Sequence, residues 1–171
     1  LIEKNSVTRY SNMIKEENDR LKMMVDALLN TAALEKSEFN LTKEKIDLHE
    51  LILFSASKFE NIINQKNGKI NLELNASRAV ITGDKFHLTN IMNNLIDSAI
   101  KYNEKPPEIK ISTRDENKAI IIIVKDNGIG ISREHLFKIF ETFYRVSSGN
   151  IQNVRGNGIG LSYAKKIVET L

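Results

Sequence analysis

Residues 119–130 read AIIIIVKDNGIG, a continuous β-branched run followed at once by Asp-Asn-Gly-x-Gly. A run of this length and composition predicts a fully buried strand over 119–125. Asp126 then lies at the end of the strand, where its carboxylate can accept a hydrogen bond from the amino group of an adenine. Gly128 and Gly130 permit a close backbone approach or a positive φ. A tight turn between a strand and a helix would use the same residues, so the motif is moderately specific.

A polar stripe marks the helix that precedes this strand. The helix is predicted to begin after an N-cap at Asp84 and to run to about Tyr102. Short oxygen-bearing side chains and a lysine share one of its faces, at Asn90, Asn94, Ser98 and Lys101. Oxygens at this spacing can hold Mg²⁺, and a lysine can meet a phosphate. Taken by itself, such a stripe is more often a solvated helix face than a ligand site.

Three alternate glycines precede the last predicted helix. Residues 155–162 read RGNGIGLS, with the glycines at Gly156, Gly158 and Gly160. Glycines at a helix N-terminus leave N–H groups and a positive dipole end available to a phosphate. A flexible loop would contain the same glycines. The pattern is not the dinucleotide-binding fingerprint, because no strand runs directly into it and no acidic residue follows about 20 positions later.

The remaining pattern predicts an α+β fold, a two-layer sandwich with helices on one face of a mixed sheet. Short strands are expected at 45–48, 70–74 and 109–112, and 79–82 is expected to form a hairpin with 70–74. Helices are expected at 49–65 and from about 158 to 171.

The N-terminal region has a different pattern. Residues 6–36 contain no Pro or Gly and place Ile14, Leu21 and Leu28 seven positions apart. This predicts a long helix with a narrow apolar stripe, of the kind that pairs with other helices. The alternative is a helix that packs on its own domain. The length of the stripe favours pairing, so we divide the chain into a helix, 1–40, and a globular domain, 41–171.

The composition excludes several classes of function. The 171 residues include 25 Lys+Arg and 22 Asp+Glu, a net charge of +3, and the basic residues are scattered. Nucleic acid is therefore not an expected partner. The absence of Cys excludes disulfides, thiol catalysis and Cys-based zinc sites. No apolar stretch approaches the length of a membrane span, so any membrane anchor is expected outside these residues.

Taken together and in this order, the motifs resemble the conserved boxes of a bacterial sensor histidine kinase. Residues 94–102, NLIDSAIKY, are similar to its N box, and 126–130 to its G1 box. Residues 139–145, IFETFYR, are similar to its F box, and 156–161 to its G2 box. Residues 16–21, EENDRL, resemble the second helix of the hairpin that dimerises and carries the phosphorylated histidine.

This resemblance implies a Bergerat-type ATP-binding fold, shared with gyrase-like ATPases, and ATP and Mg²⁺ as cofactors. It implies that Asp126 binds the adenine amino group and that Tyr102 packs against the ring. A glycine-rich segment over 132–157 would be a mobile lid anchored by Phe140 and Phe143. The G2 glycines with Leu161 complete the expected cofactor-binding residues.

The resemblance also implies a reaction. The γ-phosphoryl of ATP would pass to a histidine on the first hairpin helix, and then to an aspartate of a response regulator. Asn94, Lys101 and Arg145 are the implied catalytic residues, with Lys101 and Arg145 meeting phosphate oxygens. Asn94 and Ser98 are the implied metal ligands. The intact protein would be a homodimer, and this part of it the cytoplasmic domain of an inner-membrane sensor.

Three features depart from the family pattern. None of His49, His87 and His135 has the sequence context of the acceptor histidine, so the chain by itself is not expected to autophosphorylate. Ser98 stands where the family has an Mg²⁺-binding Asn, and a serine hydroxyl is a shorter and weaker ligand. The chain stops at Leu171, before the β-hairpin that usually closes the fold.

Two other functions stay open at this point. Relatives that hydrolyse ATP use a glutamate where this chain has Asn94, which cannot act as a base. That difference favours phosphoryl transfer over hydrolysis. A non-catalytic nucleotide-binding or dimerisation module is the second alternative, and Ser98 is the residue that makes it worth testing.

Overall fold

The computed structural model describes residues 7, 10–11, 13–15, 17–18, 41–146 and 158–171. The chain divides into two compact units, Leu1–Asn40 and Leu41–Leu171. All described residues of the first unit are helical, and Ile14 is among them. The rest of the predicted N-terminal helix, with Leu21 and Leu28, lies outside the described residues.

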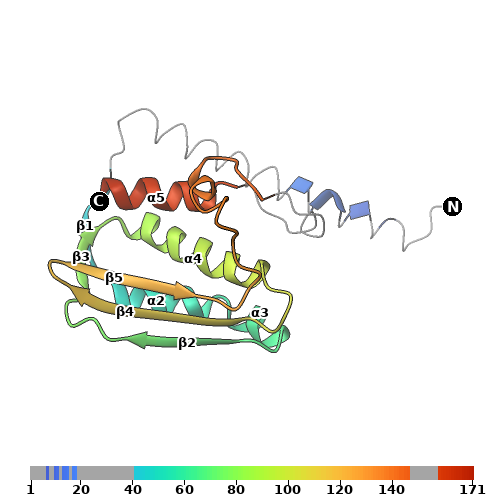
Figure 1. The fold of residues 1–171 in the computed structure, drawn as a ribbon. Coiled ribbons are helices and arrows are strands. Elements are labelled where there is room, and N and C mark those ends of the chain that lie inside the picture. The colour runs from blue at the N-terminus through green and yellow to red at the C-terminus, as the bar shows by residue number, and fades with distance from the viewer. Residues whose placement is uncertain (1–6, 8–9, 12, 16, 19–40, 147–157) are drawn as a thin grey trace. The chain divides into compact units, whose positions relative to one another are not determined.

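The second unit contains two sheets (Figure 1). The larger sheet has the order β2-β4-β5, where β2 is Lys69–Leu74, β4 is Glu108–Glu116 and β5 is Ala119–Lys125. Strand β4 runs parallel to β2 and antiparallel to β5, so the sheet is mixed. The smaller sheet pairs β1, Glu44–Asp47, with β3, Val80–Gly83, in antiparallel register. The predicted α+β fold is thereby confirmed.

Helices cover one side of the larger sheet (Figure 1). They are α2 (Leu48–Ser57), α3 (Glu60–Gln65), α4 (Lys85–Lys101) and α5 (Gly160–Thr170), with a short 3₁₀ helix, η1, at Lys138–Phe140. Helix α4 packs against both α2 and α5. It is therefore the central helix of the layer, and its side chains can reach both neighbours.

The core lies between the sheet and the helices. Ile109, Ile111 and Thr113 alternate along β4 and are buried, as a period of two requires for one face of a strand. Ile52 of α2 and Ile96 of α4 are 0% exposed. Burying side chains of this size stabilises the fold by roughly 1.5–3 kcal/mol each.

Two expectations about the strands are wrong. Residues 79–82 do not form a hairpin with β2, because β2 pairs with β4 and β3 pairs with β1. After β2, the backbone N–H of Asn75 donates to the carbonyl oxygen of Thr113 (3.2 Å), and that of Ser77 donates to Oδ2 of Asp115 (2.7 Å). These contacts with β4 hold residues 75–77 across the end of the larger sheet, so that the chain does not turn back to pair with β2.

Strand β5 is also not fully buried, since Ile123 is 43% exposed. Within the described residues β5 pairs only with β4, which makes it an edge strand. An apolar run predicts a strand but does not report how many neighbours it has.

The predicted helix over 49–65 is divided into α2 and α3. The hydroxyl of Ser57 donates to the carbonyl oxygen of Phe54 (2.9 Å). The backbone N–H of Phe59 donates to the carbonyl oxygen of Ala56 (3.0 Å). Side-chain bonds of this kind compete with the helical pattern and bend or end helices.

Candidate functional site

Helix α4 carries most of the predicted site and begins as the sequence indicates. Asp84 is its N-cap, and Oδ1 accepts from the N–H of His87 (3.0 Å). The helix continues to Lys101, and Tyr102 follows as its C-cap. Four predicted site residues, Asn90, Asn94, Ser98 and Lys101, are partly exposed along it.

The structure brings Asn94 and Gly160 together, 66 positions apart in sequence. A methyl group placed on Gly160 would lie 3.5 Å from Cγ of Asn94. Gly160 is the first residue of α5, so the N-terminus of α5 lies against the middle of the polar stripe of α4. Two motifs that the sequence shows separately thus adjoin in the fold.

The Asp-Asn-Gly motif contacts the C-terminal end of α4. The N–H of Ile129 donates to the carbonyl oxygen of Tyr102 (3.0 Å). A methyl group on Gly128 would lie 2.5 Å from that same oxygen, so only glycine fits there. Oδ1 of Asp126 accepts from the N–H of Gly128 (2.8 Å), and Asp126 is exposed. The carboxylate is therefore oriented by its own turn and accessible to a ligand.

Asn127 supports this arrangement, and sequence reasoning missed its role. Its Oδ1 accepts from the backbone N–H of Glu108 (2.8 Å) and from the side chain of Asn103, and its Nδ2 donates to the carbonyl oxygen of Pro106 (3.2 Å). The amide thus holds the loop between α4 and β4 against the turn that carries Asp126. The only sequence signal was an Asn inside a turn motif, which is common for simpler reasons.

The predicted lid residues approach the start of α5. The N–H of Phe143 donates to the carbonyl oxygen of Gly158 (2.9 Å). Gly158 has a φ of 67°, and a methyl group there would lie 2.7 Å from the carbonyl oxygen of Tyr144, so glycine is required. Phe143 is 58% exposed and Phe140 is 42% exposed, and Nζ of Lys165 lies 5.8 Å from the centre of the Phe140 ring.

The predicted cations differ in their surroundings. Nζ of Lys101 lies 2.5 Å from Oδ2 of Asp97, one turn earlier on α4. Arg145 is exposed. Because the Lys101 side chain is one-third exposed, its ion pair is screened by solvent and can be exchanged for a phosphate at small cost.

The remaining predicted site residues are Gly130, Leu161, Asn90 and Gly156. Gly130 is exposed with a φ of 72°, and Leu161 is partly exposed in the first turn of α5. Gly156 lies outside the described residues. The side chain of Asn90 lies close enough to the Tyr163 hydroxyl of α5 to lower the pKa of that hydroxyl.

The metal-binding capacity of the site is modest. Within the described residues no cluster of three or more His, Cys, Asp or Glu side chains could hold a metal ion. Asn94 and Ser98 are one helical turn apart on α4 and offer neutral oxygens. Mg²⁺ commonly takes only one or two protein ligands and the rest from phosphates and water, so these two residues fit a phosphate-borne magnesium and not a metal held by the protein.

Among the described helices, none combines the length and the apolar character that crossing a bilayer requires.

Comparison with known proteins adds independent observations. Residues 83–171 match the family described as histidine kinase-, DNA gyrase B- and HSP90-like ATPase. Over 162 residues the chain is 38% identical to the sensor protein RprX of Bacteroides fragilis, covering 93% of this chain and 31% of RprX. The chain thus spans about a third of the length of this curated relative.

Solved structures give the same picture. The nucleotide-free catalytic domain of histidine kinase ThkA superposes with a TM-score of 0.66 at 26% identity, covering 75% of this chain and 80% of that domain. ThkA in complex with the response regulator TrrA superposes with a TM-score of 0.76 at 26% identity, covering 99% of this chain and 46% of ThkA. These names favour the kinase interpretation over a non-catalytic module.

Proposed function

The chain belongs to the histidine kinase-, DNA gyrase B- and HSP90-like ATPase family, and from this we propose that it is the ATP-binding catalytic part of a bacterial sensor histidine kinase. The observation that carries the proposal is the meeting of three motifs around α4. Gly160 lies against Asn94, and Gly128 lies against Tyr102. A single ligand with an aromatic base and phosphates fits residues arranged in this order along one helix.

The base end of the site is the turn after β5. The backbone N–H of Gly128 already donates a hydrogen bond to Oδ1 of Asp126. The second carboxylate oxygen therefore accepts the hydrogen bond from the adenine amino group. A carboxylate only accepts hydrogen bonds, which suits the donor of adenine and not the carbonyl of guanine at the same position. Tyr102 packs against the ring.

The phosphate end is the N-terminus of α5. Its first-turn N–H groups and dipole favour anionic oxygens, and Gly158 and Gly160 keep the backbone open to them. Lys101 and Arg145 add positive charge that stabilises the transferring phosphoryl group. A magnesium ion carried by the phosphates, when bound, neutralises the charge that develops during transfer. Asn94 would supply a protein ligand, and Ser98, with its shorter hydroxyl, a weaker one.

The acceptor of the phosphoryl group is a histidine outside these 171 residues. Asn94 lacks the basicity to activate water, which favours transfer to a protein side chain over hydrolysis. The histidine would pass the group to an aspartate of a response regulator receiver domain. Phe140 and Phe143, in the described part of the predicted lid, would cover the nucleotide, whereas residues 147–157 of that predicted segment lie outside the described residues.

In the intact protein this part is cytoplasmic, and the membrane anchor belongs to another part of a sensor. The first unit, with Ile14, Leu21 and Leu28 in one stripe, pairs two copies of the protein. The similarity to a protein named sensor protein supports the first statement, and the heptad spacing of the helix supports the second.

The experiment that tests the proposal is the substitution Asp126→Asn. It turns one acceptor oxygen into a donor facing the adenine amino group, and the loss of a charge-assisted hydrogen bond costs about 1.5–3 kcal/mol. Affinity for a non-hydrolysable ATP analogue, measured by calorimetry, should fall by roughly 10-fold or more. The preference for the ATP over the GTP analogue should fall with it.

Asp115→Asn is the matched control. The Asp115 carboxylate is also exposed and also accepts from backbone N–H groups, those of Ser77 and Arg78, but Asp115 pairs with Ile120 near the start of β5, whereas Asp126 follows the end of that strand. Its variant should bind the ATP analogue as the unchanged chain does. A folded Asp126→Asn variant with undiminished affinity would refute the assignment of Asp126.

A further inference from the structure

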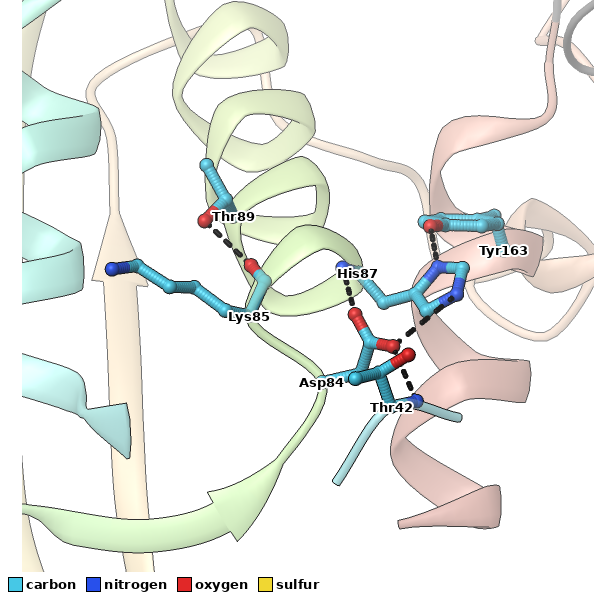
Figure 2. Close-up of polar contacts among 6 residues, drawn as sticks. All are labelled: Thr42, Asp84, Lys85, His87, Thr89 and Tyr163. Atoms are coloured by element: carbon cyan, nitrogen blue, oxygen red, sulfur yellow. Dashed lines mark hydrogen bonds and ion pairs between the residues drawn. The ribbon is translucent and has the colours of Figure 1, made fainter. Parts of the chain in front are cut away.

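A buried polar cluster links α4, α5 and the beginning of the second unit (Figure 2). Asp84 is 6% exposed, and Oδ2 accepts from the backbone N–H of Thr42 (2.9 Å). The ring of His87 lies between Asp84 and Tyr163, with Nδ1 2.6 Å from the Tyr163 hydroxyl and Nε2 4.0 Å from Oδ2 of Asp84. The sequence analysis recognised Asp84 only as an N-cap and assigned Tyr163 no role.

The donor and the acceptor of the hydrogen bond between Tyr163 and His87 can be assigned. Burial raises the pKa of the Tyr163 hydroxyl; a hydrogen bond from Asn90 lowers it and the charge of Asp84 raises it further, with a net upward shift. The hydroxyl therefore stays protonated and donates to Nδ1 of His87. In the neutral form of His87 the ring proton then resides on Nε2, which faces the carboxylate of Asp84. In this tautomer each nitrogen of His87 has a complementary neighbour.

The cluster lies one helical turn from the proposed nucleotide contacts. On α5, Tyr163 is three residues after Gly160, and its N–H donates to the carbonyl oxygen of Ile159 (2.9 Å). On α4, Asn90 is four residues before Asn94. Residues three and four apart share a helix face, so Tyr163 and Asn90 join the two helices beside the place where Gly160 meets Asn94.

We propose that Asp84, His87, Asn90 and Tyr163 act as a positioning cluster, which holds the first turn of α5 at a set distance from α4 and thereby determines nucleotide affinity. The proposal rests on the function proposed above. These are positioning residues, and Asn90, which the polar stripe of α4 also includes among the predicted site residues, acts here through Tyr163. Through Thr42 the cluster also includes the backbone at the start of the second unit, directly after the predicted dimerisation helix.

Two substitutions in the full 171-residue chain test the cluster. Tyr163→Phe removes only the hydroxyl, and His87→Leu removes both ring nitrogens by replacing the ring with a branched apolar side chain. Each should weaken binding of a non-hydrolysable ATP analogue by about 5- to 10-fold at a temperature where circular dichroism shows the variant folded. The double variant should be no weaker than either single one, because both changes break the same hydrogen bond.

A conservative variant and a matched control separate positioning from general destabilisation. His87→Asn keeps a polar atom near the position of Nδ1 and should restore affinity to within about 2-fold. His49→Leu breaks a comparable contact, in which Nε2 of His49 lies 3.0 Å from Oγ1 of Thr113, between α2 and β4. That variant should lose stability but bind nucleotide normally.

A second measurement is NMR of the protein labelled with ¹⁵N-histidine, which gives the chemical shifts of the two ring nitrogens of His87. They should report the Nε2–H tautomer in the unchanged chain and a mixture of tautomers in Tyr163→Phe. If the unchanged chain binds nucleotide and both Tyr163→Phe and His87→Leu bind it equally well, the positioning role is refuted while the proposed function stands. If the unchanged chain binds no nucleotide, the proposed function fails first and the positioning role fails with it.

Discussion

Ser98 is the single residue on which the chemistry of the proposed site depends most. It lies one turn after Asn94, partly exposed, where the family resemblance implies a magnesium-binding Asn. A serine hydroxyl on a rigid helix reaches less far than an Asn amide. We therefore expect nucleotide binding to depend chiefly on adenine and glycine contacts, with little gain from Mg²⁺.

The substitution Ser98→Asn should restore the metal dependence. Affinity for the ATP analogue in the presence of Mg²⁺ should rise by roughly tenfold, about 1.4 kcal/mol, with no change in its absence. Titration calorimetry with and without EDTA measures both. A serine form that already gains tenfold from Mg²⁺ would show that Asn94 or water carries the metal.

Asp84 makes stability depend on pH. Burial disfavours its ionised form, but the backbone N–H groups of His87 and Thr42, helped by the His87 ring and the N–H of Phe86, outweigh burial and hold the pKa of Asp84 below its ordinary value of 3.8. A carboxylate whose pKa is lower in the folded chain than in the unfolded chain stabilises the fold at pH values above its pKa in the unfolded chain. This stabilisation is lost as the pH falls through its pKa in the folded chain.

Asp84→Ala should therefore lower the free energy of unfolding by about 1–2 kcal/mol at pH 7, as the loss of an N-cap does. The difference from the unchanged chain should shrink below about pH 4. Urea unfolding at a series of pH values provides the test, and Asp84→Asn, which keeps a capping oxygen but no charge, is the control. A difference that stays constant down to pH 2.5 would contradict the assignment.

At the scale of elements, two buried side-chain atoms of the helix layer have no hydrogen-bond partner among the described residues, Oγ of Ser55 on α2 and Oδ1 of Asn93 on α4. Ser55 is 0% exposed. An unpaired buried hydroxyl costs about 1–3 kcal/mol relative to a satisfied one. Nothing in the proposed site uses this group.

Ser55→Ala should consequently raise the free energy of unfolding, by up to about 1 kcal/mol. Ser57→Ala is the matched control on the same helix, since Ser57 is exposed and its Oγ donates to Phe54. Its effect should stay within about 0.5 kcal/mol. Thermal and urea unfolding of both variants decide the point, and a destabilised Ser55→Ala would mean that the hydroxyl has a partner.

At the scale of the whole molecule, the chain should bind ATP without phosphorylating itself. Each of its three histidines has a ring nitrogen in a hydrogen bond within the second unit: His49 with Thr113, His87 with Tyr163, and His135 with Tyr144, where Nδ1 lies 2.6 Å from the hydroxyl. None is placed as an exposed acceptor. With γ-labelled ATP, acid-labile label should appear on an added hairpin that carries the family's histidine, and not on this chain. Label on His49, His87 or His135 would contradict this.

The first unit should determine the oligomeric state. If the stripe of Ile14, Leu21 and Leu28 pairs with a second copy, then Leu21→Glu with Leu28→Glu should give monomers, because charges at seam positions oppose pairing. Sedimentation equilibrium of the parent and the variant measures the change. A parent chain that is already monomeric at high concentration would show that this helix does not pair by itself.

Local sequence determined much of this protein because its signals act over a few residues. The N-cap at Asp84, the length of α4 and the glycines at 128, 130, 158 and 160 follow from capping, periodicity and backbone freedom. Together with the order of the motifs, they indicate the family before any contact is known. The roles assigned to Asp126, Lys101 and Ser98 stay predictions until the variants are measured.

Tertiary structure alone decided what depends on partners distant in sequence. The pairing of β3 with β1, the edge position of β5, and the meeting of Gly160 with Asn94 require knowledge of which elements adjoin. The same is true of the bond between His87 and Tyr163, 76 residues apart. The type of a residue determines its own preference for helix, strand or turn. Which residue it contacts across the fold depends on how all the elements of the unit pack together.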